Sequence, residues 1–162
     1  MIAKGKSISH GTAALEYDLA KEINGEAAAT EIHRHELFGC TGEEMVQEMK
    51  PYFVDFPKVK NNCLRFEVSP SVEESAGMTD ADWVKLGNDF MQRMGLANHQ
   101  YIIIRHSGTE SKKEQAHLHI LANRVSLSGE LYRDNWIGKK ATEAANAIAK
   151  ERNFVQSQDI GK

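Results

Sequence analysis

Two segments rich in isoleucine and leucine constrain the fold of this chain more than any other feature. They cover residues 100–106 and 116–123, and the stretch between them consists of Ser, Gly, Thr, Glu, Lys and Gln. Short runs of β-branched and aliphatic residues that are bounded by polar turns are typical of strands. We therefore predict that the two segments form adjacent strands of one sheet.

Three histidines lie on these predicted strands. His106 ends the first strand, and His117 and His119 stand two residues apart on the second. Side chains alternate faces along a strand, so His117 and His119 point the same way, about 7 Å apart. If the strands pair as a hairpin, the three imidazoles converge and leave a fourth coordination position open, as in a catalytic metal site. The alternative is a set of half-exposed polar side chains, since two histidines two residues apart also arise by chance.

The other candidate metal ligands have weaker patterns. His33 and His35 form a second pair, but their neighbours are charged and no asparagine follows at the corresponding spacing, so we interpret them as a solvated face. Cys40 and Cys63 are far apart and form no Cys-x-x-Cys arrangement. This indicates reduced, buried or half-buried thiols rather than a disulfide or a zinc site.

Length and composition fit one globular domain. The chain has 162 residues, of which 41% are hydrophobic and 27% are charged, and this is sufficient for a hydrophobic core. No apolar run approaches the roughly 20 residues of a membrane span, and the N-terminus lacks the apolar region of a signal peptide, so we expect a cytoplasmic protein with no membrane partner. The net charge of −3 is unusual for a nucleic-acid-binding protein. A locally basic cleft or a bound divalent cation would offset it.

Hydrophobic periodicity predicts the remaining elements. Strands are expected at residues 2–9, with Gly5 as a bulge, and at 32–37 and 63–69. Helices are expected over residues 12–23, from 41 to a kink or end at Pro51, over 79–94 and over 135–152, with Thr12, Thr41, Thr79 and Asn135 as N-caps. No glycine-rich phosphate loop is present in the sequence. The pattern favours an α+β fold in which helices pack on a central antiparallel sheet.

Together these features resemble the HUH-type mobilisation relaxases, the nickases that start plasmid and transposon transfer. The similarity rests on a histidine at a strand end, a polar turn and then His-x-His-x-x-x-Asn, which here runs from His117 to Asn123. Tyr17 in the first predicted helix, Phe-Glu-Val-Ser-Pro at residues 66–70 and Asn135-Trp136 follow the family's order. The resemblance covers residues 1–154, which we predict to be one nuclease domain followed by a tail at 155–162.

The resemblance implies a central antiparallel sheet with the histidines on its middle strands. It implies that His106, His117 and His119 hold Mg²⁺ or Mn²⁺, although three imidazoles would also accept zinc, cobalt or nickel. It further implies that Tyr17 attacks single-stranded DNA at a transfer origin and leaves a 5′-phosphotyrosyl link and a free 3′-hydroxyl. Glu67 resembles the acidic residue that these enzymes place near the histidines, where a carboxylate would orient an imidazole. A plain exposed glutamate on a strand is the alternative.

Further DNA contacts are expected from Asn123, Arg124, Lys139 and Lys140. The two lysines lie in the first turns of the last predicted helix, where they would meet a phosphate backbone or form a solvated face. Many relatives carry an Asp-Thr-Asp turn between the histidine strands, whereas this chain has Ser-Gly-Thr-Glu ending at Glu110, followed by an insertion with lysines. Glu110 is the candidate substitute for the acidic turn residue.

Two other functions fit parts of this pattern. A histidine-triad nucleotide hydrolase needs a third alternating histidine, but position 121 is leucine. A non-catalytic, metal-stabilised DNA-binding module would use the histidines without needing Tyr17. A relaxase domain of this size is expected to be the N-terminal part of a longer protein or to act with accessory mobilisation proteins.

Overall fold

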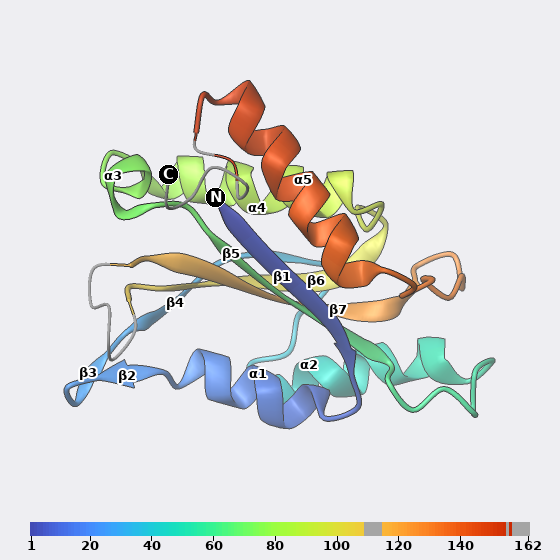
Figure 1. The fold of residues 1–162 in the computed structure, drawn as a ribbon. Coiled ribbons are helices and arrows are strands. Elements are labelled where there is room, and N and C mark those ends of the chain that lie inside the picture. Colours follow the sequence, from blue (N-terminus) through green and yellow to red (C-terminus); the bar gives the residue numbers. More distant parts are fainter. Residues whose placement is uncertain (109–114, 155, 157–162) are drawn as a thin grey trace.

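A computed structural model describes residues 1–108, 115–154 and 156, and its centre is a five-stranded sheet (Figure 1). The strand order is β1-β5-β7-β6-β4, and all neighbouring strands are antiparallel. The predicted α+β architecture with an antiparallel sheet is therefore confirmed, and β7 is its middle strand. The bounds are Ile2–Ile8 for β1, Ala29–His35 for β4, Cys63–Ser69 for β5, His99–His106 for β6 and His117–Ser126 for β7.

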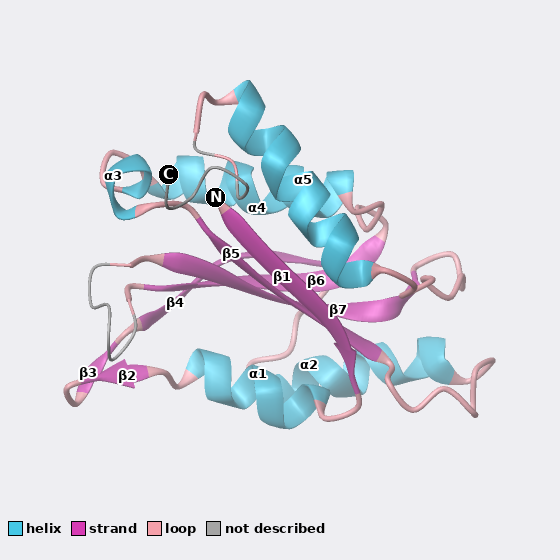
Figure 2. Cartoon of the chain, viewed as in Figure 1, coloured by secondary structure: helices cyan, strands magenta, loops and turns pink. Residues whose placement is uncertain are grey.

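Helices cover both faces of the sheet (Figures 1 and 2). On one face lie α1 (Gly11–Leu19) and α2 (Gly42–Met49), the latter continued by the 3₁₀ helix η1 (Lys50–Phe53). On the other face lie α3 (Val72–Ser75), α4 (Asp80–Arg93) and α5 (Ile137–Glu151). A two-stranded hairpin of β2 (Glu22–Ile23) and β3 (Glu26–Ala27) follows α1. No helix among the described residues is long and apolar enough to cross a lipid bilayer.

The alternation of side chains along β7 divides the interior into two cores. Leu118 and Ile120 join the larger core beneath α4 and α5, which also contains Phe66 and Phe90. Leu121 points to the opposite face and joins the smaller core beneath α1 and α2. His117 and His119 have the same parity as Leu121, so they lie on the face that α1 covers.

Most predicted elements are confirmed, and the differences have local causes. The first helix has His10 rather than Thr12 at its N-cap, with no side-chain cap hydrogen bond, and it ends at Leu19. Ile23 instead belongs to β2. The last helix has Trp136 rather than Asn135 at its N-cap, with a left-handed backbone (φ 59°) and no side-chain cap hydrogen bond. The short helix α3 was not predicted; it begins with a capping box between Ser71 and Glu74.

Gly5 is not a bulge, because it pairs in register with Phe66. A β-carbon at this position would lie 2.6 Å from a ring carbon of Phe66, and that buried ring packs edge-on against Phe90. We expect Gly5→Ala to lower the free energy of unfolding by about 1–3 kcal/mol, because a packed ring has to move. Urea unfolding measures the loss. Gly77→Ala is the control, since a β-carbon there would meet nothing within 4 Å, and an equal loss in both variants would contradict the steric explanation.

His99 should make stability depend on pH. Burial lowers the pKa of its imidazole below the usual 6.5, although a hydrogen bond to the Asn123 carbonyl and the charge of Glu130 oppose this. Below pH 6.5 the unfolded chain therefore binds more protons than the folded one, and stability falls by up to about 1.4 kcal/mol per pH unit. We expect His99→Gln to lose less stability than wild type between about pH 7.5 and about pH 5.5 in urea unfolding with a chelator present. The exposed His10 supplies the control His10→Gln, which should keep the wild-type difference.

Candidate metal centre

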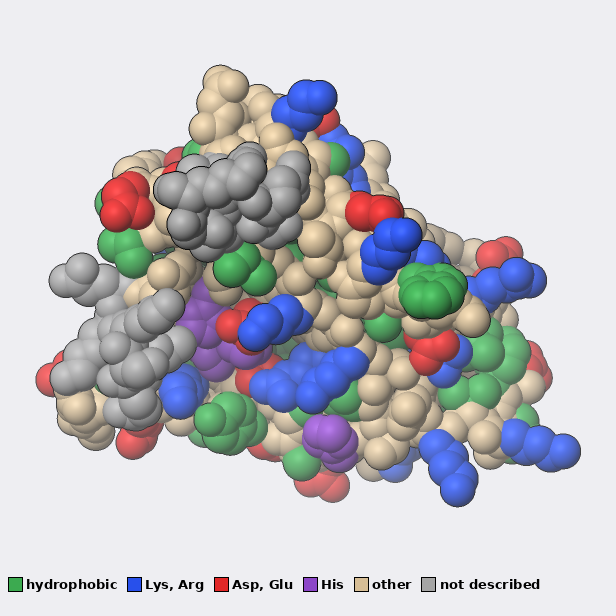
Figure 3. All heavy atoms as spheres, in the orientation of Figure 1, with side chains coloured by type: hydrophobic (Ala, Val, Ile, Leu, Met, Phe, Trp, Pro, Cys, Tyr) green, Lys and Arg blue, Asp and Glu red, His purple; other side chains and the backbone are tan. Residues whose placement is uncertain are grey.

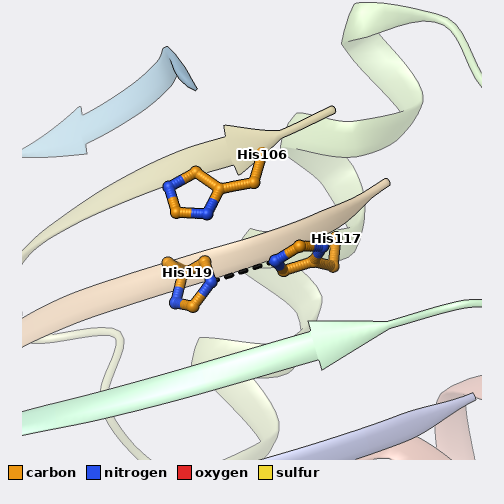
Figure 4. A group of neighbouring side chains, drawn as sticks. All are labelled: His106, His117 and His119. Carbon is orange, nitrogen blue, oxygen red and sulfur yellow. Dashed lines mark hydrogen bonds between the residues drawn. The ribbon is translucent and has the colours of Figure 1, made fainter. Parts of the chain in front are cut away.

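Three imidazoles meet at one end of β6 and β7. His106 is the register partner of His117, and Ile104 is the partner of His119, so the antiparallel pairing places all three histidines together. The ring centroid of His106 lies 5.3 Å from that of His117 and 4.2 Å from that of His119. Figure 4 shows the three rings gathered on the same side of the two strands. The predicted convergence is therefore present.

Backbone carbonyls fix two of these rings. The Nε2–H of His106 donates to the carbonyl oxygen of Asp18 at 2.7 Å, and the Nδ1–H of His117 donates to the carbonyl oxygen of Gln115 at 2.8 Å. A neutral imidazole has one donor nitrogen and one acceptor nitrogen. These bonds therefore leave Nδ1 of His106 and Nε2 of His117 as the acceptor nitrogens.

His119 occupies the position between its two neighbours and the helix α1. Its Nε2–H donates to the Nε2 of His117 at 3.1 Å. Among the described residues its buried Nδ1 has no hydrogen-bond partner, and the carboxylate oxygen Oδ1 of Asp18 faces it at 3.8 Å. Buried polar atoms normally have a hydrogen-bond partner. The unpartnered nitrogen therefore indicates a site that is arranged to bind a group from outside the protein.

The three side chains fit a cation. One ring nitrogen from each histidine lies within 4.8 Å of the others. Tetrahedral zinc–imidazole bonds place ligand nitrogens about 3.3 Å apart, close to the 3.1 Å between the Nε2 atoms of His117 and His119. Burial, together with the neighbouring His106 and His117, lowers the pKa of His119 to about 2, and burial also lowers the pKa of His106. Both shifts favour the neutral form of these two imidazoles, which is the form that donates a lone pair to a metal.

A buried ion pair lies behind the cluster. Asp18 on α1 is only 1% exposed, and its carboxylate accepts from the guanidinium of Arg65 on β5 at 2.5 Å and 3.3 Å. Burial raises the pKa of Asp18, while the hydrogen bond and charge of Arg65 act in the opposite direction. The ion pair therefore links α1 to β5 beside the histidines of β6 and β7.

A basic hollow opens beside His119. It has a volume of about 250 Å³ and is lined by Lys4, Gly5 and Lys6 of β1, by Arg65, Phe66 and Glu67 of β5 and by His119. Lys4 and Lys6 are the register partners of Glu67 and Arg65, so three cationic side chains share the hollow with a single carboxylate. Figure 3 shows basic side chains next to a histidine patch on this surface. A locally positive cleft is therefore present on a chain whose net charge is −3.

Comparisons with known proteins agree with this geometry. The sequence matches the family described as "Relaxase: MobA/VirD2-like, nuclease domain" over residues 17–154. The chain belongs to this relaxase family. A solved structure described as "Molecular Basis of Vancomycin Resistance Transfer in Staphylococcus aureus" is similar over 95% of both chains, with a TM-score of 0.50 and 12% sequence identity, which supports the relaxase fold. A comparison with curated proteins gave no significant match.

In this relaxase domain the predicted nucleophile lies one residue from the ion pair. Tyr17 is 60% exposed, and its hydroxyl accepts from Nζ of Lys21 at 3.4 Å. Successive residues of an α-helix are about 100° apart around its axis, so Tyr17 flanks the side of α1 that carries Asp18. Tyr17 lies off the apolar side of α1, on which Leu15 is fully buried.

Glu67 lies opposite His119 in the pairing of β5 with β7 and lines the basic hollow. Its predicted place near the histidines is therefore observed, and its chemical role stays a prediction. Glu110 lies outside the described residues. So does most of the predicted tail, at residues 155 and 157–162.

The expected DNA contact of Asn123 needs correction. Asn123 is 0% exposed, and its amide donates to the carbonyl of Met49 at 3.3 Å and to Oε1 of Gln100 at 2.9 Å. Its Oδ1 accepts from the backbone of Val125 at 2.9 Å. The side chain ties the end of α2 to the sheet, and this burial argues against a contact with DNA.

The other predicted DNA contacts lie away from the histidine face. Arg124 is held by the carbonyls of Tyr132 and Asn61 and by Asp134. Lys139 is exposed on α5, and Lys140 lies over the ring of Tyr132 and donates to the carbonyl of Arg133. Their binding to DNA stays a prediction.

The second histidine pair is only partly solvated. His33 and His35 are half-buried and tilt against the ring of Tyr101, and the Nδ1–H of His35 donates to the carbonyl of His99. Among the described residues, the only cluster suited to a metal is His106, His117 and His119. Both cysteines are free thiols, as predicted, but Cys40 is exposed rather than buried. Burial raises the pKa of Cys63 to about 12.

Sequence reasoning missed Asp18, Arg65, Lys4 and Lys6. A signal for Asp18 was present, because a charged residue three positions after Leu15 and next to Leu19 lies near the apolar stripe and must find a partner when buried. Lys4 and Lys6 alternate on the first strand and so share a face. That this face adjoins the histidines follows only from the sheet order.

Proposed function

We propose that this relaxase domain nicks and rejoins single-stranded DNA at a transfer origin, with Tyr17 as the nucleophile and a divalent cation held by His106, His117 and His119. The observation that carries the proposal is the convergence of three imidazoles beside a basic hollow, on the face that α1 covers. Mg²⁺ or Mn²⁺ is the expected ion. When bound, it would act as a Lewis acid on the non-bridging oxygens of the scissile phosphate.

The proposed reaction is a transesterification. The phenol oxygen of Tyr17 bonds to phosphorus and loses its proton, and the bond from phosphorus to the 3′ oxygen breaks. That oxygen takes up a proton and becomes a free 3′-hydroxyl, while the DNA is held by a 5′-phosphotyrosyl link. Because the energy of the phosphodiester is kept in the covalent link, the reverse attack rejoins the strand.

The neutral phenol of a tyrosine is a poor nucleophile. At neutral pH about one free tyrosine in a thousand is ionised, and reaching the phenolate costs roughly 4 kcal/mol. The Nζ of Lys21 lies 3.4 Å from the Tyr17 hydroxyl and 5.6 Å from the centre of its ring. A cation at this position stabilises the negative charge that develops on the oxygen.

The basic hollow supports a path for the DNA strand. Lys4 and Lys6 stand two residues apart on the edge strand β1, about 7 Å along the chain, and Arg65 continues the basic surface toward His119. Phosphate contacts of this kind position a strand without reading its sequence. Gly138 at the start of α5 comes near the carbonyl of Gly5, so a strand that crosses the β1 edge would next reach Lys139 and Lys140.

Glu67 is proposed to assist the histidines. It lies opposite His119 on the neighbouring strand, where a carboxylate would help to hold an imidazole or a bound cation in place. Accessory mobilisation proteins are proposed partners, because none of the residues named above would choose the nick site.

The test uses a library of random single-stranded DNA labelled at the 3′ end and incubated with the protein and Mn²⁺. Cleavage by Tyr17 leaves the labelled fragment attached to protein, so we expect adducts that survive denaturing electrophoresis and depend on the metal. Sequencing of the captured DNA gives the nick site, and peptide mass spectrometry gives the modified residue. DNA that binds reversibly without any adduct would indicate the non-catalytic DNA-binding module instead.

A further inference from the structure

Asp18 joins the proposed nucleophile to the histidine cluster. It follows Tyr17 directly on α1 and is buried, and it contacts three different strands. Its carboxylate pairs with Arg65 of β5, its backbone carbonyl accepts from His106 of β6, and its Oδ1 faces Nδ1 of His119 of β7 at 3.8 Å. Asp18 therefore lies against two of the three histidines and against Arg65 at the same time.

We propose that Asp18 is the positioning residue of the metal centre, which orients His106 through its carbonyl and His119 through its carboxylate. This rests on the proposed function, since it concerns the same three histidines. The carbonyl keeps the proton of His106 on Nε2 and turns Nδ1 toward the centre. With a cation bound, the carboxylate would hold the proton of His119 on Nδ1, so that Nε2, which faces Nε2 of His117 at 3.1 Å, is the ligand atom.

The proposal gives the unpartnered nitrogen of His119 a purpose. If Nε2 of His119 binds a cation, Nδ1 carries the hydrogen, and that buried hydrogen needs an acceptor. The nitrogen has no hydrogen-bond partner in the described part of the protein, and the facing group is the Asp18 carboxylate. Carboxylates that accept from metal-bound histidines fix the ring and raise its basicity as a ligand.

The ion pair also sets the charge next to the cation. The Arg65 side chain is largely buried, 21% exposed, and would repel a divalent ion if its charge were not balanced. Asp18 supplies the balancing charge from the side of the helix. The two residues of the pair therefore have opposite expected effects on metal affinity, although both would stabilise the fold.

This difference gives a direct test by calorimetric titration of Zn²⁺ and Mn²⁺ without DNA. We expect Asp18→Asn to weaken metal binding about 10–100-fold, as for other residues that orient metal ligands, and Arg65→Gln to leave it unchanged or stronger. Asp89→Asn is the control, because Asp89 pairs with Arg152 on the other face of the sheet. Equal weakening in Asp18→Asn and Arg65→Gln would show a purely structural pair and overturn the proposal, as would unchanged binding in Asp18→Asn.

A second measurement needs no variant and so does not depend on folding of Asp18→Asn. Nitrogen-15 NMR of the wild-type imidazoles with Zn²⁺ bound should show the proton on Nε2 in His106 and on Nδ1 in His119. The opposite tautomer of His119 would overturn the proposal while leaving the proposed nicking activity standing. Failure of the wild-type protein to bind either ion would instead overturn the metal centre itself.

Discussion

Replacing Tyr17 by phenylalanine should abolish the covalent adduct with DNA while leaving the fold and metal binding intact. The phenol oxygen is the atom that would bond to phosphorus, and phenylalanine lacks only that atom. We expect the rate of adduct formation to fall by about a thousand-fold or more, as for other enzymes that lose their nucleophile. The side chain is 60% exposed and its only described hydrogen bond is to Lys21, so the change should hardly affect stability.

The measurement is the yield of denaturation-resistant adduct with the captured DNA sequence, followed over time in the presence of Mn²⁺. Tyr52→Phe is the matched control, because Tyr52 is a half-buried tyrosine of η1 that takes no part in the histidine cluster. It should form adduct at the wild-type rate. Adduct formation by Tyr17→Phe at an undiminished rate would assign the nucleophile to another residue.

Replacing His119 by alanine should remove both metal binding and nicking. The change removes the ligand that lies closest to both other rings. Nε2 of His119 lies 3.1 Å from Nε2 of His117, and its ring centroid lies 4.2 Å from that of His106. Two imidazoles do not form the three-ligand site of a catalytic metal. We therefore expect a loss of metal affinity of more than about 100-fold, since even residues behind the ligands are worth 10–100-fold.

Calorimetric titration with Mn²⁺ and the adduct assay give the two readouts. His10→Ala is the control, because His10 is exposed and its side chain makes no cap hydrogen bond to α1. Thermal unfolding of both variants shows whether the alanine disturbs the sheet. If His119→Ala kept wild-type metal affinity, the cluster would not be the metal site, whatever happened to nicking.

The sequence was sufficient to predict the parts of the site that depend on local periodicity. The two-residue repeat of a strand placed His117 and His119 on one face, and a hairpin placed His106 beside them. By the same alternation, Tyr101 lies on the face of β6 opposite to His106, where its hydroxyl donates to Oδ1 of Asn88. The capping residues Thr41 and Thr79 fixed the starts of two helices, and both accept the expected backbone hydrogen bond.

Other features required the order of strands in the sheet. Asn123 has the parity of the histidines and was expected to meet DNA, but α2 and η1 cover that part of β7 and bury its side chain. Trp136 begins α5 with a left-handed backbone that no capping pattern indicated. Alternation along a strand specifies the face on which a side chain lies. Which helix covers that face depends on packing between distant segments.

By itself the sequence determined the strands, their faces and the histidines that share one of them, because alternation along a strand is a local property of the backbone. Only the tertiary structure decided which groups surround those histidines. β5 pairs with β7, and β1 pairs with β5, although both are far from β7 in sequence, and this order brings Lys4, Lys6 and Arg65 to the site. Asp18 reaches the rings because α1 packs across the same face. Contacts between distant segments arise from burying side chains against one another, and no local pattern encodes them.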